Sequence, residues 1–421
     1  MHNSTFMRSV LVLASGTGIS QAILLFISFF LTRLYTPNDF GILGFYMAIV
    51  SIVSIIASLR YDMAIVIAAE KSMAINLLIL SILLILGTFV AAILVCVPLL
   101  DHFFSSEIRR FWFLLPLGII AESLYYPFSY WLIRGKQFKT IAVNRIIMSV
   151  TTAGVQLGLA SFTLIPGLIV GRVTGGFSSI ISIIPSLREN IKLIQKVNIS
   201  TLKSAARRYI NFSLLSSGAA VLNTIGGRLP VLMLAWGYGN AVVGWFVLCE
   251  TILGAPSMLI GQSVGQVYLS EAAVLVSTDP KALLPLCIRT AKKMAMLAVI
   301  PCIIIATISK WLIPVIWGEP WIESGRYMQF LALMFMAQFI MLPIGQFSII
   351  ERQDLALLWN MARLFFVFIA FLVAKQTNMS ALSAIGIYSV VLFLLYVLMF
   401  VMIVWAIKVK QLEFESRNKT A

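Results

Sequence analysis

The sequence predicts an all-α, polytopic membrane protein, and three observations support this fold class. Mean hydropathy is +0.99, and 60% of the 421 residues are hydrophobic. Only 11% of the residues are charged. Apolar stretches of the roughly 20 residues that a helix needs to cross a bilayer recur about twelve times and fill almost the whole chain. We therefore expect no separate soluble domain.

The expected spans follow one another with short connections. Those of the first half are Met7–Leu31, Gly41–Ala69, Ala74–Leu99, Phe111–Leu132, Ile141–Leu164 and Leu168–Pro185. Those of the second half are Tyr209–Trp236, Val242–Val267, Arg289–Trp317, Gly325–Ile349, Leu355–Ala374 and Ala381–Val409. The apolar run of the first span continues well past Ala14-Ser15-Gly16 and is longer than the core of a signal peptide, so we expect it to stay as an anchor.

The basic residues predict the orientation of the chain. Lys and Arg number 31 against 16 Asp and Glu, a net charge of +15. With the N-terminus inside, the even-numbered loops and both tails would hold roughly 21 of the basic residues and the odd-numbered loops about six. The other four lie within spans: Arg60, Arg172, Arg228 and Arg363. Both termini are thus expected to be cytoplasmic, and the excess of positive charge gives no support to nucleic-acid binding.

The sequence offers no set of residues suited to catalysis or to metal binding. Its four cysteines have no paired spacing and suit apolar packing. With only two histidines and no Ser-His-Asp arrangement at a membrane-facing end, neither a metal cluster nor a catalytic triad is expected. We expect a protein that is not an enzyme and that has no cofactor.

A polar connection near the middle divides the spans into two halves of six. We predict an N-terminal half over 1–187, a cytoplasmic linker over 188–208, a C-terminal half over 209–409 and a cytoplasmic tail over 410–421. The linker, Arg188–Arg208, is the longest polar stretch. From Ile191 it suits either a basic amphipathic helix on the inner membrane surface or a solvated connection whose charges hold the topology.

Ionisable side chains inside the apolar stretches indicate transport. They are Arg60, Asp62, Glu122, Arg228, Glu250 and Arg363. One charged residue at the centre of an inserting helix costs roughly 2.5–3.5 kcal/mol, so such residues usually face a hydrated cavity and contact a substrate or an ion.

Five sequence motifs carry a resemblance to a known family. They are RLYTPNDFG from Arg33, LRYDMAIV from Leu59, LPVLMLAWGYGNAVVGWF from Leu229, GAPSMLIGQSVGQVYLSEAA from Gly254 and WGEPWIESGRYMQFLALM from Trp317. In this order they resemble the polysaccharide-biosynthesis branch of the multidrug/oligosaccharidyl-lipid/polysaccharide (MOP) exporter superfamily, the Wzx-type O-antigen flippases. The resemblance runs from about residue 7 to about residue 364.

The resemblance implies a fold and a function. It implies a V-shaped bundle, like that of the MATE transporters, whose two halves open alternately to the cytoplasm and the periplasm. It also implies that the protein flips undecaprenyl-diphosphate-linked oligosaccharides, such as O-antigen repeat units, across the bacterial inner membrane. Its partners would be this lipid-linked oligosaccharide, membrane lipids and other polysaccharide-assembly proteins.

A diphosphate that crosses a membrane calls for fixed cations. Arginine suits it because the guanidinium stays charged and presents a planar fork to phosphate oxygens. We expect substrate contacts from Arg228 first, then from Arg363 and Arg60, with Arg33 and Arg172 nearer the outer rim. In many relatives an acid precedes the residue at the position of Arg228, and here Gly227 replaces it, so Arg228 either meets an anion or pairs with Glu250.

The acids are candidates for coupling to H⁺ or Na⁺: Glu122, Glu250 and Asp62. Glu122 lies between Pro116 and Pro127, and interrupted helices often line such sites. Because residues two apart on a helix do not face each other, we expect Arg60 and Asp62 not to form an ion pair. Arg60 would point toward the central path, and Asp62 would meet another helix or extend toward the inner surface.

Other functions remain as alternatives. A multidrug exporter of the same superfamily would share the fold, but its cavity should favour acids and aromatic rings. An O-antigen polymerase would be expected to have a large periplasmic loop, whereas the longest outer loop here, Leu100–Arg110, is short. A major-facilitator transporter would be expected to carry a basic turn between its second and third helices, which IAAEKSMA from Ile67 does not match.

Overall fold

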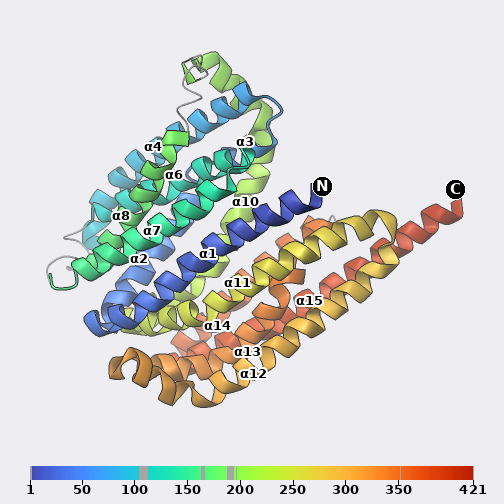
Figure 1. The fold of residues 1–421 in the computed structure, drawn as a ribbon. Helices are drawn as coiled ribbons and strands as arrows, with labels where there is room; N and C mark the ends of the chain where they lie inside the picture. The colour runs from blue at the N-terminus through green and yellow to red at the C-terminus, as the bar shows by residue number, and fades with distance from the viewer. Residues whose placement is uncertain are drawn as a thin grey trace. The chain divides into compact units, whose positions relative to one another are not determined.

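The chain folds as a succession of α-helices (Figure 1). The computed structural model describes residues 2–103, 112–162, 166–186, 194–195, 197–350 and 352–420. Within these ranges no residue lies in a β-strand. Contacts divide the chain into two compact units, unit 1 (Met1–Arg228) and unit 2 (Leu229–Ala421). The division falls inside one long helix.

Within the described residues, unit 1 contains seven complete helices and the first part of an eighth. They are α1 (His2–Leu34), α2 (Pro37–Ile56), α3 (Tyr61–Ile67), α4 (Lys71–Phe103), α6 (Leu114–Arg134), α7 (Phe138–Gly158), α8 (Gly167–Ile183) and α10 (Ile199–Tyr238). Unit 2 holds the rest of α10, followed by α11 (Asn240–Thr278), α12 (Leu283–Trp317), α13 (Ile322–Ile344), α14 (Gln353–Gln376) and α15 (Ala381–Thr420). Short 3₁₀ turns at Pro280–Ala282, Glu319–Trp321 and Phe347–Ile350 lie between helices of unit 2.

Helices lie at the positions of all twelve expected membrane spans. Ten helices of the described chain are long and apolar enough to cross a bilayer. They are α1, α2, α4, α8 and α10 through α15. Two more helices of 21 residues, α6 and α7, lie where the fourth and fifth spans were expected, and they carry more polar residues. The all-α, polytopic membrane fold expected from the sequence is confirmed.

Several expected boundaries are wrong; α11 and α15, for example, run to Thr278 and Thr420, past the expected ends at Val267 and Val409. The second span, Gly41–Ala69, is not one helix, because α2 ends at Ile56 and α3 begins only at Tyr61. The seventh span begins at Ile199 rather than Tyr209, so 199–208 continue directly into the membrane helix α10. Residues 187–193 and 196 of the polar connection, and 104–110 of the outer loop, lie outside the described residues. The orientation of the termini stays a prediction.

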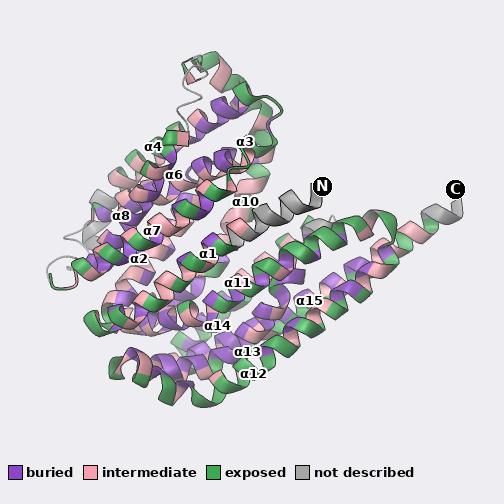
Figure 2. Cartoon of the chain, in the orientation of Figure 1, coloured by how far each residue is buried: buried purple, intermediate pink, exposed green. Residues whose placement is uncertain are grey.

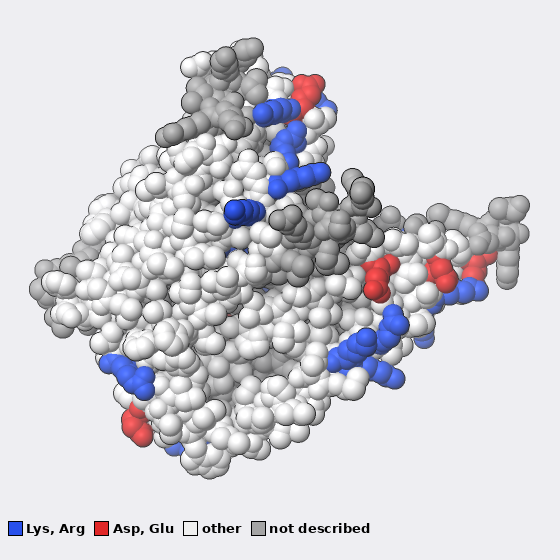
Figure 3. Space-filling view, in the orientation of Figure 1, with Lys and Arg blue, Asp and Glu red and all other residues white. Residues whose placement is uncertain are grey.

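The surface suits a surrounding of lipid. Figure 2 shows buried stripes along the helices of each unit, with exposed residues on their other faces. Many exposed side chains are large and apolar, such as Met296, Ile300 and Val315 of α12. On the face drawn in Figure 3, charged side chains gather in a few groups, and a broad uncharged surface lies between them. This distribution is typical of membrane proteins.

Small residues bring α7 and α8 of unit 1 close together. Gly171 and Gly175 are four residues apart on α8, the spacing of small residues at close helix contacts in membranes. A Cβ atom on Gly171 would lie 2.8 Å from the carbonyl oxygen of Thr152, and one on Gly175 would lie 3.0 Å from that of Met148. A backbone oxygen cannot move aside as a side chain can, so both positions require glycine.

Polar side chains reinforce the same contact. The Asn144 amide of α7 donates to the Ser179 carbonyl oxygen and to the Ser182 hydroxyl of α8, both at 2.6 Å. In return, the Ser179 hydroxyl donates to Asn144 Oδ1 at 2.9 Å. The next residue of α7, Arg145, donates to the hydroxyl of Thr17 on α1. These bonds between helices replace the hydrophobic drive that is weak in lipid.

In unit 2, α13 is the central helix and packs against α11, α12 and α15. Gly325 of α13 lies against the backbone of α12, where the Ser309 hydroxyl donates to its carbonyl oxygen at 2.8 Å. The Ser324 hydroxyl donates to the Trp245 carbonyl oxygen of α11 at 3.1 Å. Trp321, fully buried, fills the space beside the start of α13. Small and hydroxyl residues thus join these helices as they do in unit 1.

The α7–α8 contact gives a stability test. Replacing Gly171 with leucine should force the two helices apart and cost about 1–3 kcal/mol, the usual effect of overpacking. The melting temperature of the purified full-length protein in detergent should fall. The control is Gly154→Leu, because Gly154 is exposed on α7 and a Cβ there meets nothing within 4 Å. Equal melting temperatures for the two variants would contradict the close contact.

Candidate functional site

The break between α2 and α3 is the most unusual backbone feature of unit 1. Leu59 and Arg60 have φ values of 47° and 59°, in the left-handed region, although neither is glycine. This conformation costs roughly 1–2 kcal/mol per residue. Short-range hydrogen bonds close the turn, from the Tyr61 amide to Ser58 at 3.1 Å and from the Met63 amide to Arg60 at 3.2 Å. The chain holds this conformation without help from glycine or proline.

Hydroxyl groups from two other helices satisfy the carbonyl groups that the break leaves open. The Thr88 hydroxyl of α4 donates to the Ala57 carbonyl oxygen at 3.2 Å. The buried Ser213 hydroxyl of α10 donates to the Leu59 carbonyl oxygen. An irregular backbone at membrane depth is tolerated only where such partners replace the missing helical bonds. The break is therefore supported by α4 and α10 together.

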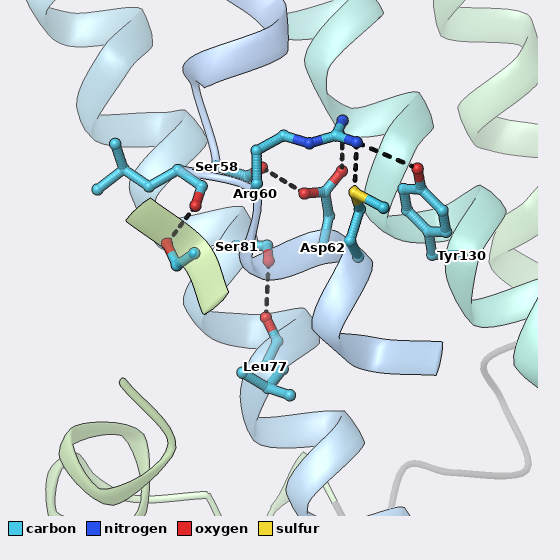
Figure 4. Close-up of polar contacts among 9 residues, drawn as sticks. Ser58, Arg60, Asp62, Leu77, Ser81 and Tyr130 are labelled. Carbon is cyan, nitrogen blue, oxygen red and sulfur yellow. Dashed lines mark hydrogen bonds and ion pairs between the residues drawn. The ribbon is translucent and has the colours of Figure 1, made fainter. Parts of the chain in front are cut away.

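An ion pair lies at the break (Figure 4). Arg60 Nη1 is 3.9 Å from Asp62 Oδ2, and the two residues are 8% and 1% exposed. The Ser58 hydroxyl donates to Asp62 Oδ1 at 2.9 Å. Arg60 Nη2 also approaches the sulfur of Met63 and, at 3.5 Å, the hydroxyl of Tyr130 on α6.

The expectation that Arg60 and Asp62 do not pair is wrong. It assumed a continuous helix, in which residues two apart point in different directions. Arg60 instead lies before the first residue of α3, in a left-handed conformation that turns its side chain back over Asp62. The alternative that Asp62 extends toward the membrane surface is also wrong, because its side chain is buried and its carboxylate contacts Ser58 and Arg60.

A second ion pair joins α6 and α8. Arg172 Nη2 donates to Glu122 Oε2 at 3.3 Å, and both side chains are partly exposed. The expected interruption of the helix between Pro116 and Pro127 is wrong, because α6 runs unbroken from Leu114 to Arg134. Glu122 is therefore held by a counter-ion on a regular helix. Sequence spacing could not have indicated this pair, since its members are 50 residues apart.

Arg228 lies on α10, two residues before Pro230. Its side chain is half-buried, and within the described residues it forms no hydrogen bond and no ion pair. Proline has no N–H group, so Pro230 leaves the carbonyl group of Gly226 without its helical donor. Next to it, a Cβ on Gly227 would meet no atom within 4 Å. The absence of an acid at residue 227 thus leaves Arg228 without a neighbouring counter-ion on its own helix.

The remaining candidates have different surroundings. The guanidinium of Arg363 on α14 lies 4.9 Å from the ring centre of Trp359, and its Nη2 donates to Asn360 Oδ1 at 3.3 Å. Glu250 is half-buried on α11. Arg33 is exposed at the end of α1 and donates to the Phe29 carbonyl oxygen of its own helix at 2.8 Å.

The structure therefore groups the candidates by their neighbours. It joins Arg60 to Asp62 and Glu122 to Arg172, and it leaves Arg228 without a counter-ion in the described chain. Sequence analysis missed the polar residues around the break, namely Ser58, Thr88, Tyr130 and Ser213. Single hydroxyl residues in apolar helices carry no periodic signal. In the described ranges, no group of three or more His, Cys, Asp or Glu residues could hold a metal ion.

Comparison with known proteins identifies the family. Residues 30–326 match the model of the polysaccharide biosynthesis protein family. The chain belongs to this family. The match covers the break, both ion pairs and Arg228, so these features lie within the part of the chain that defines membership. No curated protein matches the sequence.

Solved structures show the same fold in transporters. The lipid II flippase MurJ in an inward closed conformation has a TM-score of 0.64 and 16% identity, over 98% of this chain and 89% of MurJ. An inward-facing MATE multidrug transporter of the MOP superfamily has a TM-score of 0.62 and 14% identity, over 96% and 95%. The Vibrio cholerae MATE transporter VcmN in its bent form has a TM-score of 0.55 and 14% identity, over 97% and 98%. This family member is thus a multi-pass membrane protein with the fold of MOP-superfamily flippases and exporters.

The Glu122–Arg172 pair can be tested with a double-mutant cycle. Glu122→Gln and Arg172→Gln should each destabilise the protein, because each leaves a charge in the membrane without its counter-ion. The double variant should lose less than the sum of the two, with a coupling of about 0.5–3 kcal/mol. Thermal unfolding of the detergent-solubilised protein measures this coupling.

The control cycle uses the more exposed pair Glu323–Arg326 of α13, three residues apart. Its coupling should be about 0.3–0.5 kcal/mol, as for surface pairs on helices. Strictly additive losses for Glu122 and Arg172 would show that their ion pair does not stabilise unit 1.

Proposed function

We propose that this protein flips undecaprenyl-diphosphate-linked oligosaccharide repeat units, of O-antigen or a similar surface polysaccharide, across the bacterial inner membrane by alternating access. Membership of the polysaccharide biosynthesis family supports the class of cargo. The fold shared with the lipid II flippase MurJ supports the class of transport. In this proposal both termini are cytoplasmic, and membrane lipids and other polysaccharide-assembly proteins are the partners.

The observation that carries the proposal is the state of Arg228. A guanidinium within a membrane helix needs a counter-ion or water, and Arg228 has no acidic partner in the described chain. A diphosphate offers it two charged groups of oxygen acceptors in the geometry that arginine binds best. The lipid tail can stay in the bilayer while the diphosphate and the sugars pass along a hydrated path. Arg228 is therefore the first candidate for substrate binding.

The other arginines follow in an order set by their neighbours. Arg363 is next, since its guanidinium lies against the Trp359 ring and donates to Asn360 Oδ1, both of them neutral groups. Arg60 could bind an anion only by giving up Asp62. Arg172 already has Glu122, and Arg33 binds the end of its own helix, so both are weaker candidates.

Coupling to H⁺ or Na⁺ would use the acids. Asp62 and Glu122 are held by arginines, and a proton taken up by either carboxylate would release its arginine. Glu250 on α11 completes the set of candidates. In this scheme the same groups would respond to the ion and to the charge of the substrate.

A multidrug exporter is the second candidate function, because MATE transporters share the fold at nearly the same TM-score as MurJ. The charges separate the two proposals. A cavity for cationic drugs needs acids, whereas Arg228, which has no counter-ion in the described chain, carries a positive charge. Resistance of cells to cationic drugs on overexpression, with unchanged surface polysaccharide on deletion, would favour the exporter.

Deletion of the gene tests the flippase directly. Lipid-linked repeat units should accumulate on the cytoplasmic face, and surface polysaccharide should be lost. Arg228→Ala should fail to restore the polysaccharide while reaching a normal protein level, because the fixed charge for the diphosphate is gone. Extracted lipid-linked sugars and surface glycan are the two measurements.

The matched control is Lys203→Ala, which removes an exposed cation from the same helix. It should restore surface polysaccharide fully. Unaltered surface polysaccharide in the deletion strain would contradict the proposed function, and full restoration by Arg228→Ala would remove Arg228 from the site.

A further inference from the structure

The Arg60–Asp62 ion pair and the break between α2 and α3 depend on each other. In a continuous α-helix each residue turns by about 100°, so side chains two apart point roughly 200° away from each other. Arg60 and Asp62 could then not meet. In the structure they do meet, because Leu59 and Arg60 are left-handed. The ion pair thus exists only while the helix is broken.

The backbone has hydrogen-bond partners in both arrangements. In the broken form, hydroxyls of Thr88 and Ser213 bind the carbonyl groups of Ala57 and Leu59. In a continuous helix, the amides four residues later would bind these two carbonyl groups. Closing the break therefore leaves no backbone group without a partner and removes two left-handed residues. The Arg60–Asp62 attraction, supported by the Ser58 hydroxyl, opposes this closure.

The pair is also loosely held. Arg60 Nη1 and Asp62 Oδ2 are 3.9 Å apart, and in the described chain neither Asp62 Oδ2 nor Arg60 Nε has a hydrogen-bond partner. Buried polar atoms normally have partners, so two unsatisfied atoms in one buried pair need an explanation. A diphosphate could give the guanidinium two short, parallel bonds that this carboxylate does not provide.

We propose that the Arg60–Asp62 pair is a latch. It holds the break between α2 and α3, and a diphosphate anion that takes Arg60 from Asp62 releases the latch, so that α2 and α3 join into one helix. Asp62 is then a positioning residue that acts through Arg60. The identity of the anion rests on the proposed function, whereas the link between the pair and the break does not.

The length from α2 to α3 reports the state of the latch. Spin labels on Asn38→Cys and Ile67→Cys, both exposed positions, would lie about 44 Å apart along one continuous helix, and closer together when the helix is broken. The labels are placed in the full-length protein with its four native cysteines replaced. Pulsed electron–electron resonance in lipid nanodiscs measures the distance.

Neutralising the latch should lengthen this distance. Asp62→Asn keeps the size of the side chain and removes its charge, so the population should shift toward about 44 Å. Should that variant fail to fold because Arg60 lacks a counter-ion, the Arg60→Gln/Asp62→Asn pair removes both charges and should give the same shift. Glu70→Gln, which neutralises an exposed carboxylate three residues after α3, should leave the distance unchanged. A distance that stays short in both latch variants overturns the proposal.

Two rescue variants separate the latch from a general loss of structure. Exchanging the charges, Arg60→Asp with Asp62→Arg, should restore the short distance. Leu59→Gly added to Asp62→Asn should restore it as well, because glycine adopts the left-handed conformation readily. A long distance in both rescued proteins would contradict the role of the pair and of the left-handed residues.

Inorganic diphosphate tests the release. Added to the wild-type protein, it should lengthen the distance, whereas sodium chloride at equal ionic strength and diphosphate added to Arg60→Gln should cause no change. If the label distance is long in Asp62→Asn but stays short in the wild-type protein with diphosphate, then diphosphate does not release the latch. The two proposals can also fail separately. If diphosphate lengthens the distance but deletion of the gene leaves lipid-linked sugars and surface glycan unaltered, the latch is supported and the proposed function is overturned.

Discussion

The cost of holding a charge among apolar helices governs the polar organisation of both units. Each guanidinium in a span needs a carboxylate, a cluster of dipoles, an aromatic face or water. The protein uses different solutions at different positions: Asp62 for Arg60, Glu122 for Arg172, and a tryptophan with an asparagine for Arg363. Arg228 forms no ion pair, no hydrogen bond and no contact with an aromatic face within the described residues. In the proposed function, an anion on a hydrated path takes the place of these partners.

The same cost explains the break in the second span. Two left-handed residues and two carbonyl groups outside the helical pattern would be unfavourable in lipid. Hydroxyl groups on α4 and α10 bind the carbonyl groups, and the Arg60–Asp62 ion pair lies at the same break. In the proposed latch, a continuous helix would bind the same carbonyl groups with its own amides, so the two arrangements would have comparable backbone bonding. A carrier that alternates between conformations requires elements of this kind.

Much of the fold follows from the sequence, because hydropathy reports directly on the need for spans of bilayer length. The family was also evident from turn motifs such as RLYTPNDFG. The two ion pairs, in contrast, were not evident from the sequence. The Arg60–Asp62 prediction failed because helix periodicity was applied across 57–60, where neither glycine nor proline marks a break and the supporting hydroxyls come from residues 88 and 213. The Glu122–Arg172 pair depends on the packing of α6 against α8, which sequence spacing does not encode.

Transfer of a lipid-linked oligosaccharide by the purified protein tests the central claim most directly. The full-length protein would be reconstituted into liposomes containing undecaprenyl-diphosphate oligosaccharide, with equal total lipid in protein-free vesicles. A membrane-impermeant glycosidase, added outside after the exposed pool has been digested, reports on newly flipped molecules. We predict continued digestion with the wild-type protein and with Lys203→Ala, and none with Arg228→Ala or without protein. The wild-type protein must be folded and supplied with proton and sodium gradients. A digestion rate equal to that of protein-free vesicles under these conditions would contradict the account.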